Sequence, residues 1–378
     1  NELPNLKALL PYLAEHWHVY LAESAFTGPG ANDYPGETPV RATDEARLED
    51  GPPGSDIGVL SKHVFDDNQT DIAILTCGFR SGSVHNHDLA ADLSKAVNDW
   101  QIEQWLDQDS RFRASIVVPN QNPIRSAEEI ERIGDHPGFV QVMLPVRADA
   151  PYGNLRYDPI YEAAARKGLA IAIHYGGAPG LPPTPSGWPS TYVEEYVDQA
   201  AIFQSQVMSL IVEGVFDRFP ETRVALVESG WTWTPSTMWR IDKEWKGLRR
   251  DTPWVKRRPS EYIREHIRLT TQPTDAPKQS EVNQLTEIID QLGSDEILMY
   301  ASDYPHNHGT DPNAFLETVD PALKQKILHQ LLLLKVQVSD KVLQELAHLD
   351  FENFLHRNQM SGTTIGTVHQ GKPHETHH

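Results

Sequence analysis

The sequence predicts an α/β fold, a (β/α)8 TIM barrel in which parallel strands alternate with helices. Seven short apolar segments recur between residues 71 and 301, almost without polar alternation. Strands that are buried on both faces of a parallel sheet have this composition. Helical segments separate nearly all of them. No Gly-x-Gly-x-x-Gly follows any strand, which disfavours an open, doubly wound sheet that binds dinucleotides.

The N-terminal half begins with a predicted helix over residues 6–23, where leucines and aromatic residues recur at helical spacing. Residues 24–56 are rich in Gly, Pro, Asp and Glu, so we expect an excursion that covers the barrel mouth or meets another subunit. Apolar strands are predicted at 71–76, 112–118, 139–144 and 169–173, and Pro119 and Pro145 end the second and third of them. Helices are predicted at 57–67, 88–108, 125–134 and 157–167, with Asp88 as the cap of the second and Gly168 as the stop of the fourth.

The C-terminal half continues the alternation after a loop rich in Pro, Gly and Ser at 178–190. Seven strands need one more to close a barrel, and we expect it before Asn1, with upstream residues absent from this sequence. We expect one domain over residues 1–366 and a disordered, polar tail over 367–378. The remaining strands are predicted at 223–227, 267–270 and 296–301, with helices at 192–218, 231–249, 281–292, 323–334 and 340–356.

Charge and cysteine content narrow the class of partner. The net charge of -20, from 33 basic and 53 acidic residues, argues against nucleic acid and against an anionic membrane face. No apolar run approaches the ~20 residues of a membrane span. With Cys77 as the one cysteine, a disulfide framework within the chain is excluded, and we expect a cytoplasmic protein. We therefore expect a small-molecule substrate, and a homodimer is compatible with the excursion.

Polar residues directly follow several predicted strands. His174, Glu228 and Asp303 come after the apolar runs of the fourth, fifth and seventh strands. Since the carboxyl ends of barrel strands meet at one face, these three side chains should converge. Imidazole and carboxylates are ligands for Zn, Mn or Fe, and a bound metal lowers the pKa of a ligand water to about 7. The sequence therefore predicts a divalent metal, preferably Zn, held by His174, Asp303 and Glu228, and no organic cofactor.

Further candidates flank these three. His306 can ligate, donate a proton or merely line the pocket. Arg80 and Arg147 also follow strands, and either guanidinium can clamp a substrate carboxylate by two hydrogen bonds. Surface ion pairing is an equally good interpretation of both arginines. A purely structural role is open to Asp303, which can cap a turn, and to Glu228, which can neutralise an arginine.

Several motifs in a fixed order carry a resemblance to a known family. Ala172-Ile-His-Tyr-Gly-Gly177, Val227-Glu-Ser-Gly230 and Ala301-Ser-Asp-Tyr-Pro-His306 together resemble the amidohydrolase-related family, metal-dependent TIM-barrel proteins that include aminocarboxymuconate semialdehyde decarboxylase. The resemblance covers roughly residues 1–320. It implies that His174 is a metal ligand and that Asp303 is a ligand or the base near a metal-bound water, beside a His-x-His of the first strand that has no counterpart here. It also implies acid–base work at position 228, where those relatives have His.

Three functions follow as hypotheses. The first is a metal-dependent hydrolase, in which Asp303 activates a metal-bound water against a lactone, amide or ester and Glu228 is its acid–base partner. The second is a non-oxidative decarboxylase of an aromatic or unsaturated acid. The third is a catalytically weak barrel that binds small molecules. The density of aromatic residues around Trp188, Trp231, Trp233 and Trp239 is compatible with a flat or aromatic ligand, but core and interface packing is the favoured interpretation.

Overall fold

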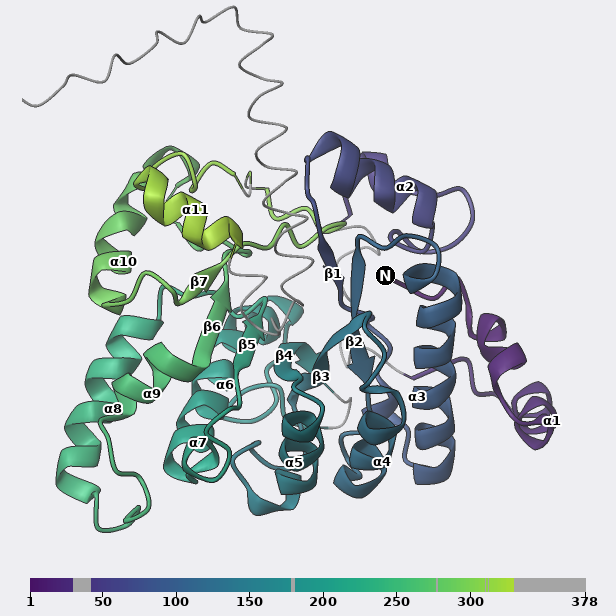
Figure 1. The fold of residues 1–378 in the computed structure, drawn as a ribbon, viewed down its shortest axis with the longest axis horizontal. Coiled ribbons are helices and arrows are strands. Elements are labelled where there is room, and N and C mark those ends of the chain that lie inside the picture. The colour runs from purple at the N-terminus through teal and green to yellow at the C-terminus, as the bar shows by residue number, and fades with distance from the viewer. Residues whose placement is uncertain (30–41, 178–180, 277, 310, 312, 330–378) are drawn as a thin grey trace, which may run out of the picture. The chain divides into compact units, whose positions relative to one another are not determined.

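Seven parallel strands of the described chain form one sheet, in the order β1-β2-β3-β4-β5-β6-β7 (Figure 1). Each strand pairs with the next along the chain, which is the strand order of a barrel wall. One cavity is lined both by β1 and by the segment after β7, so the sheet curls until its two edges face each other. The strands are β1 Ala73–Leu75, β2 Phe112–Val117, β3 Phe139–Arg147, β4 Ala170–Gly177, β5 Val224–Val227, β6 Ile267–Thr270 and β7 Leu298–Met299.

The computed structural model describes residues 1–29, 42–177, 181–276, 278–309, 311 and 313–329. All of them belong to one compact unit, Asn1–Lys335. The predicted helix 340–356, the domain boundary at residue 366 and the tail 367–378 lie outside the described residues. Within the described part, every helix is too short or too polar to cross a membrane.

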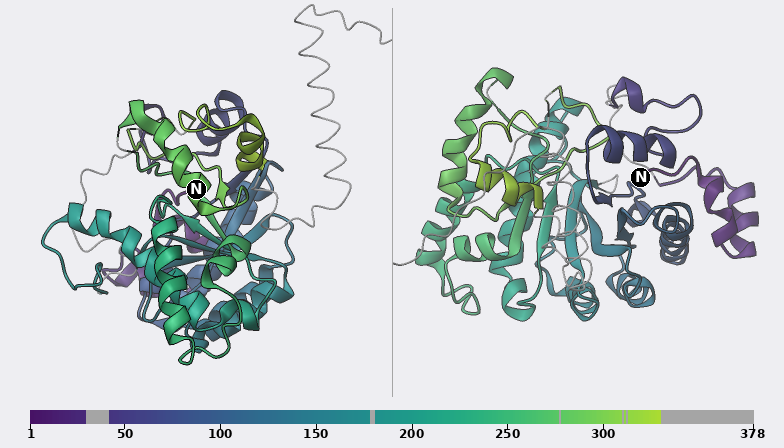
Figure 2. Two further views of the ribbon diagram at one scale, coloured as in Figure 1. Left: turned by 90° about the vertical axis from the view of Figure 1, so that its left-hand side faces the viewer. Right: turned by 45° about the horizontal axis from the view of Figure 1, so that its top comes forward.

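Helices follow the strands along the chain and pack against the sheet (Figures 1 and 2). Among these contacts, α3 packs against β2, α5 against β4, α9 against β6 and α11 against β7. The alternation confirms the predicted fold class. The helices are α1 Glu15–Glu23, α2 Ile57–Ser61, α3 His87–Gln101, α4 Pro123–Ile133, α5 Asp158–Arg166, α6 Tyr192–Val212, α7 Val215–Arg218, α8 Thr234–Leu248, α9 Pro259–His266, α10 Leu285–Leu292 and α11 Pro321–His329.

Two long predicted helices are each divided, and one helix was not foreseen. The segment 6–23 consists of a 3-10 helix, Leu6–Tyr12, and α1, separated by the extended residue Leu13. Pro11 lies just before this break, and proline lacks the N–H that would continue an α-helix. The segment 192–218 divides into α6 and α7 at Gly214, whose φ of 75° is left-handed. Helix α9, which begins at Pro259, was not predicted from the sequence.

Two strand ends and one helix cap also differ from prediction. β3 continues through Pro145 to Arg147. The ladder with β4 shifts its register just there, between Pro145 and Arg147, so the missing proline N–H falls at an irregularity. β4 runs on to Gly177, so His174 lies inside the strand. Asn86, not Asp88, caps α3, because its side-chain oxygen accepts hydrogen bonds from two backbone N–H groups of the first turn.

Small side chains fill the inner face of the sheet. Ala170, Ala172, Ala225 and Met299 form a cluster of their own, separate from the main hydrophobic core. Successive residues of a strand point to opposite faces, so His174 shares the face of Ala172. The small alanines leave room around its ring, and the carboxyl ends of β4, β5 and β7 become the walls of a site.

Candidate active site at the carboxyl ends of β4, β5 and β7

His174 presents one ring nitrogen to the site. Its Nδ1 lies 2.9 Å from the carbonyl oxygen of Tyr175, to which it donates. A histidine that donates through Nδ1 keeps the lone pair of Nε2 for a ligand or an acid. Nε2 lies 3.7 Å from Oε1 of Glu228. The backbone of β4 therefore sets both the orientation of the ring and its tautomer.

Glu228 is a buried carboxyl group directly after β5. Its side chain is 7% exposed, and its Oε1 accepts no hydrogen bond from the described residues. This oxygen lies 3.6 Å from Nδ1 of His306 as well as 3.7 Å from His174. Burial, and next the neighbouring charge of Asp303, raise the pKa of Glu228 above its usual value. Burial and the neighbouring carboxylate thus both shift Glu228 toward its protonated form.

Asp303 follows β7 and is ionised by its neighbours. Burial acts to raise the pKa of Asp303, but hydrogen bonds from His306 and His308 outweigh it and hold that pKa well below the usual range. Nδ1 of His306 lies 3.2 Å from Oδ2 of Asp303, and Nε2 of His308 donates a short hydrogen bond to the same oxygen. The hydrogen bond to Asp303, together with the nearby carboxyl group of Glu228, raises the pKa of His306 to about 10.

The backbone is strained at two of these positions. Of the described residues other than glycine, Gln69, Glu228 and Asp303 have a positive φ, at 52°, 59° and 55°. A left-handed residue with a side chain costs free energy, of the order of 1–3 kcal/mol, and such strain concentrates at functional sites. At both strand ends the turn redirects a carboxyl group toward the site.

The excursion before β1 holds the loop after β7 in place. Ala42 forms an antiparallel bridge with His306, and the N–H of Thr43 donates to the carbonyl of Pro305 at 2.9 Å. The ring of His63 lies 2.9 Å from the hydroxyl of Tyr304. The described part of the excursion therefore contacts the barrel mouth, as the sequence predicts for residues 24–56.

Most of the predicted residues converge, and one histidine was missed. The contacts above form a continuous chain from His174 through Glu228 and His306 to Asp303. His308, only 10% exposed, joins them through Asp303 and is not among the site residues predicted from the sequence. Its signal in the sequence is the spacing His306-Asn-His308, close behind an aspartate at a strand end. Asp303, His306 and His308 offer ligand atoms that all lie within 4.8 Å of one another.

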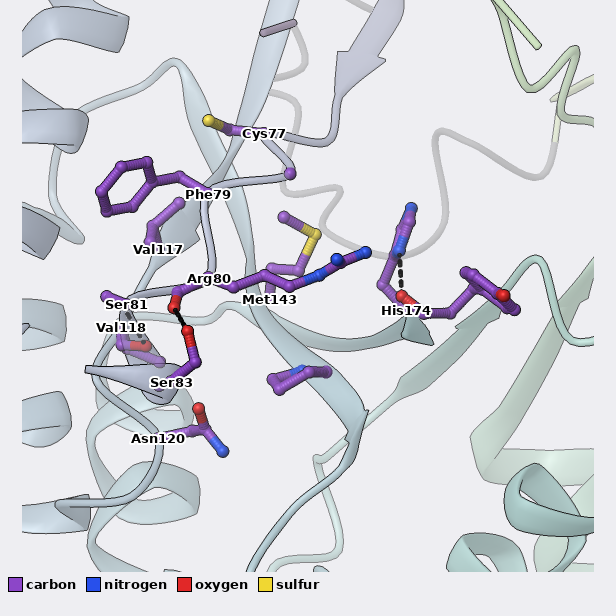
Figure 3. A pocket seen from close by; sticks show the side chains of 14 residues that line it. Cys77, Phe79, Arg80, Ser81, Ser83, Val117, Val118, Asn120, Met143 and His174 are labelled. Atoms are coloured by element: carbon purple, nitrogen blue, oxygen red, sulfur yellow. Dashed lines mark hydrogen bonds between the residues drawn. The ribbon is translucent and has the colours of Figure 1, made fainter. Parts of the chain in front are cut away.

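Arg80 lies beside this chain of contacts, in a pocket that it shares with His174. Figure 3 shows its side chain reaching across the pocket toward the ring of His174. Gly176 makes the approach possible, because a Cβ there would lie 2.6 Å from Nη2 of Arg80. Phe79, Met143 and Tyr175 also line the pocket, which combines a cation with apolar and aromatic walls.

Arg147 has a different environment. Its Nη2 lies 3.0 Å from Oε1 of Glu195 on α6, and the two side chains are 3% and 1% exposed. The guanidinium therefore already has a carboxylate partner within the chain. A substrate clamp at Arg147 stays a prediction, and it would have to break a buried ion pair.

We expect Arg147→Met to lower the free energy of unfolding by about 3–5 kcal/mol, because Glu195 would be left buried without its partner. The double variant Arg147→Met/Glu195→Leu should recover most of that loss, since neither charge remains. Urea unfolding of both variants measures this. A double variant of normal stability but greatly raised KM would instead make Arg147 a substrate ligand.

The tryptophans considered as contacts for an aromatic ligand differ in exposure. Trp231 is fully buried, whereas Trp188 and Trp239 are more than half exposed. Trp233 donates from its ring N–H to the carbonyl of Ser229, next to Glu228. For Trp231, core packing is the better of the two interpretations.

Comparison with known proteins identifies the family. The sequence profile described as "Amidohydrolase" matches residues 73–332, which contain all seven strands and the whole chain of contacts. The chain belongs to the amidohydrolase family. The predicted resemblance is thus confirmed, as is the prediction of an enzyme of this family with hydrolase and carboxy-lyase both left open.

Several proteins similar to this chain are named as decarboxylases. A gamma-resorcylate decarboxylase from Rhodococcus jostii is 25% identical over 314 residues, covering 74% of this chain and 86% of the relative. A 2,6-dihydroxybenzoate decarboxylase structure from Rhizobium matches with a TM-score of 0.60 at 20% identity, over 74% of this chain and 88% of that one. A dihydroxybenzoic acid decarboxylase from Polaromonas, with bound manganese and 2-nitroresorcinol, matches with a TM-score of 0.59 at 22% identity, over 74% and 86%. The structural likeness supports the barrel fold.

Proposed function

We propose that this amidohydrolase is a non-oxidative decarboxylase of an aromatic acid and uses a divalent cation. The observation that carries the proposal is the pair of carboxyl groups at the ends of β5 and β7. Glu228 is buried with a raised pKa, whereas Asp303 is held ionised. When the environments of two carboxyl groups give them different pKa values, the group with the higher pKa can act as an acid while the other stays ionised. The activity of the named relatives supports the second of the predicted functions over hydrolysis.

The donors at the site fit a divalent cation. Nε2 of His174 keeps its lone pair, Asp303 is ionised, and the buried Oε1 of Glu228 lacks a hydrogen bond from the described residues. Nitrogen and carboxylate donors suit Zn, Mn or Fe. His174 and Asp303 would hold the cation, whose positive charge would bind and orient the substrate oxygens. The manganese in the Polaromonas relative makes Mn the first cation to test, and Zn stays a prediction.

Decarboxylation requires a proton donor, and Glu228 can fill this role. The bond between the ring carbon and the carboxylate breaks, carbon dioxide leaves, and the electron pair stays on the ring carbon. A proton must then reach that carbon. We assign the proton to Glu228 and not a ligand role, because its burial favours the protonated form. The resemblance implies acid–base work at the same position.

Arg80 completes the proposal as the residue that binds the substrate. Its guanidinium faces the ring of His174 in a pocket with aromatic and apolar walls (Figure 3). A hydroxybenzoate has a flat ring and adjacent anionic oxygens, and a guanidinium binds such oxygens by two hydrogen bonds. The predicted homodimer and cytoplasmic location stay predictions.

The test uses the purified protein loaded with Mn or Zn and two groups of substrates. Hydroxybenzoic acids, including 2,6-dihydroxybenzoate and 5-carboxyvanillate, report decarboxylation through released carbon dioxide. Aromatic lactones and esters report hydrolysis. We expect release of carbon dioxide from at least one acid and no ester cleavage. Cleavage of a lactone or ester without carbon dioxide release would replace the proposal by the hydrolase.

A further inference from the structure

The chain contains three His-x-His pairs within its described part, and one of them stands next to a carboxylate in the site. His16 and His18 lie on α1, where the ring of His18 contacts the carbonyl of Leu13. His85 and His87 lie where the loop after β1 enters α3. His306 and His308 follow β7, and both contact Asp303. Among the described residues, Asp303, His306 and His308 form a cluster of side chains close enough together to hold a metal ion.

We propose that His306 and His308, on the loop after β7, ligate the divalent cation together with Asp303. This inference rests on the proposed function, because it concerns the cation of that same site. The pair raises the donor set from His174 and Asp303 to four. The sequence leaves three roles open for His306, and this inference assigns it the role of a metal ligand.

The positions of the three donor atoms suit a cation. Metal–nitrogen and metal–oxygen bonds of about 2.0–2.2 Å place donors up to about 4.3 Å apart across one ion. The three donors lie within 4.8 Å of one another, so displacements of a few tenths of an ångström bring them into range. Asp303 and His308 are 12% and 10% exposed, whereas His306 is 49% exposed. Asp303 and His308 are thus shielded from solvent, whereas His306 is accessible to it.

The loop is built to hold both rings in place. The side-chain oxygen of Asn307 accepts the N–H of Gly309 at 2.8 Å, which closes the turn that carries His308. The N–H of His306 donates to the carbonyl of Asp303 at 2.8 Å. The bridge from Ala42 to His306 fixes the loop from outside. Donors that are fixed before binding lose less conformational entropy when the ion arrives.

Glu228 supplies an independent observation that points to a cation at this place. Its Oε1 is buried, accepts no hydrogen bond from the described residues and lies 3.6 Å from Nδ1 of His306. A buried oxygen with no hydrogen-bond donor is unusual in a folded protein, so this position needs a partner that the described residues do not provide. A divalent ion bound beside Asp303 would place a positive charge next to this oxygen.

The test measures metal content, and activity is recorded separately. His306→Asn/His308→Asn is compared with wild type and with the matched control His85→Asn/His87→Asn, which removes the same spacing elsewhere. After dialysis against trace Mn or Zn, inductively coupled plasma mass spectrometry gives the metal per chain. The absorption spectrum of cobalt-substituted protein reports nitrogen ligands. Circular dichroism checks that each variant is folded.

We expect about one cation per chain in wild type and control, and binding at least about 100-fold weaker in the 306/308 variant. The cobalt spectrum should change in that variant alone. Wild-type metal content and an unchanged cobalt spectrum in the 306/308 variant would overturn the inference, even if wild type releases carbon dioxide. Loss of metal in this variant, with no carbon dioxide from wild type on any acid, would uphold the ligands and refute the decarboxylase.

Discussion

We expect Asp303→Asn to lower kcat about 1,000-fold and to leave the fold intact. The substitution removes the negative charge that attracts a cation and that pairs with His306 and His308. An amide oxygen can still accept a hydrogen bond, but the amide nitrogen cannot. Asparagine also tolerates the left-handed φ of 55° at this position, so little strain is added. Turnover, circular dichroism and thermal unfolding of the variant measure the two effects.

The control for this variant is Asp290→Asn, which makes the same change on an exposed residue of α10. We expect wild-type turnover from the control. An Asp303→Asn enzyme that turns over at the wild-type rate would remove Asp303 from the mechanism. If the variant instead fails to fold, the carboxylate is needed for the structure of the β7 loop.

We expect Glu228→Gln to lower kcat by about 100- to 10,000-fold, with little change in KM. Glutamine keeps the size and polarity of the side chain but has no proton to give to the ring carbon. Binding of the substrate depends on Arg80 and the cation, so it should persist. A loss in kcat without a loss in KM marks an interaction made only in the transition state. Steady-state kinetics on the best acid of the panel separates the two parameters.

Glu228→His is a second variant to test at this position, because the resemblance implies histidine here in better-known relatives. Histidine can donate a proton and is among the residues that adopt a positive φ more readily than most. We therefore expect it to recover part of the activity that glutamine loses. Glu221→Gln, on an exposed residue before β5, is the control. Full activity in Glu228→Gln would place the proton donor elsewhere.

The periodicity of the sequence predicted the barrel because each unit is local. An apolar strand buried on both faces and an amphipathic helix can each be recognised within one stretch of chain. The boundaries were less accurate where a neighbour decides them. β3 passes through Pro145 because the register shift against β4 absorbs the missing N–H, and nothing in the residues around Pro145 indicates that shift.

The convergence of His174, Glu228 and Asp303 was predictable from the sequence, because parallel strands end at one face and each residue directly follows an apolar run. The partners of these residues were decided by the tertiary structure. Arg147 pairs with Glu195 of a distant helix, and His308 turns back onto Asp303. The raised pKa of Glu228 needs both its burial and a second carboxylate, and these come from different strands. Residue types and strand order are local properties of the chain, whereas charge, strain and hydrogen bonding at the site depend on which strand ends meet.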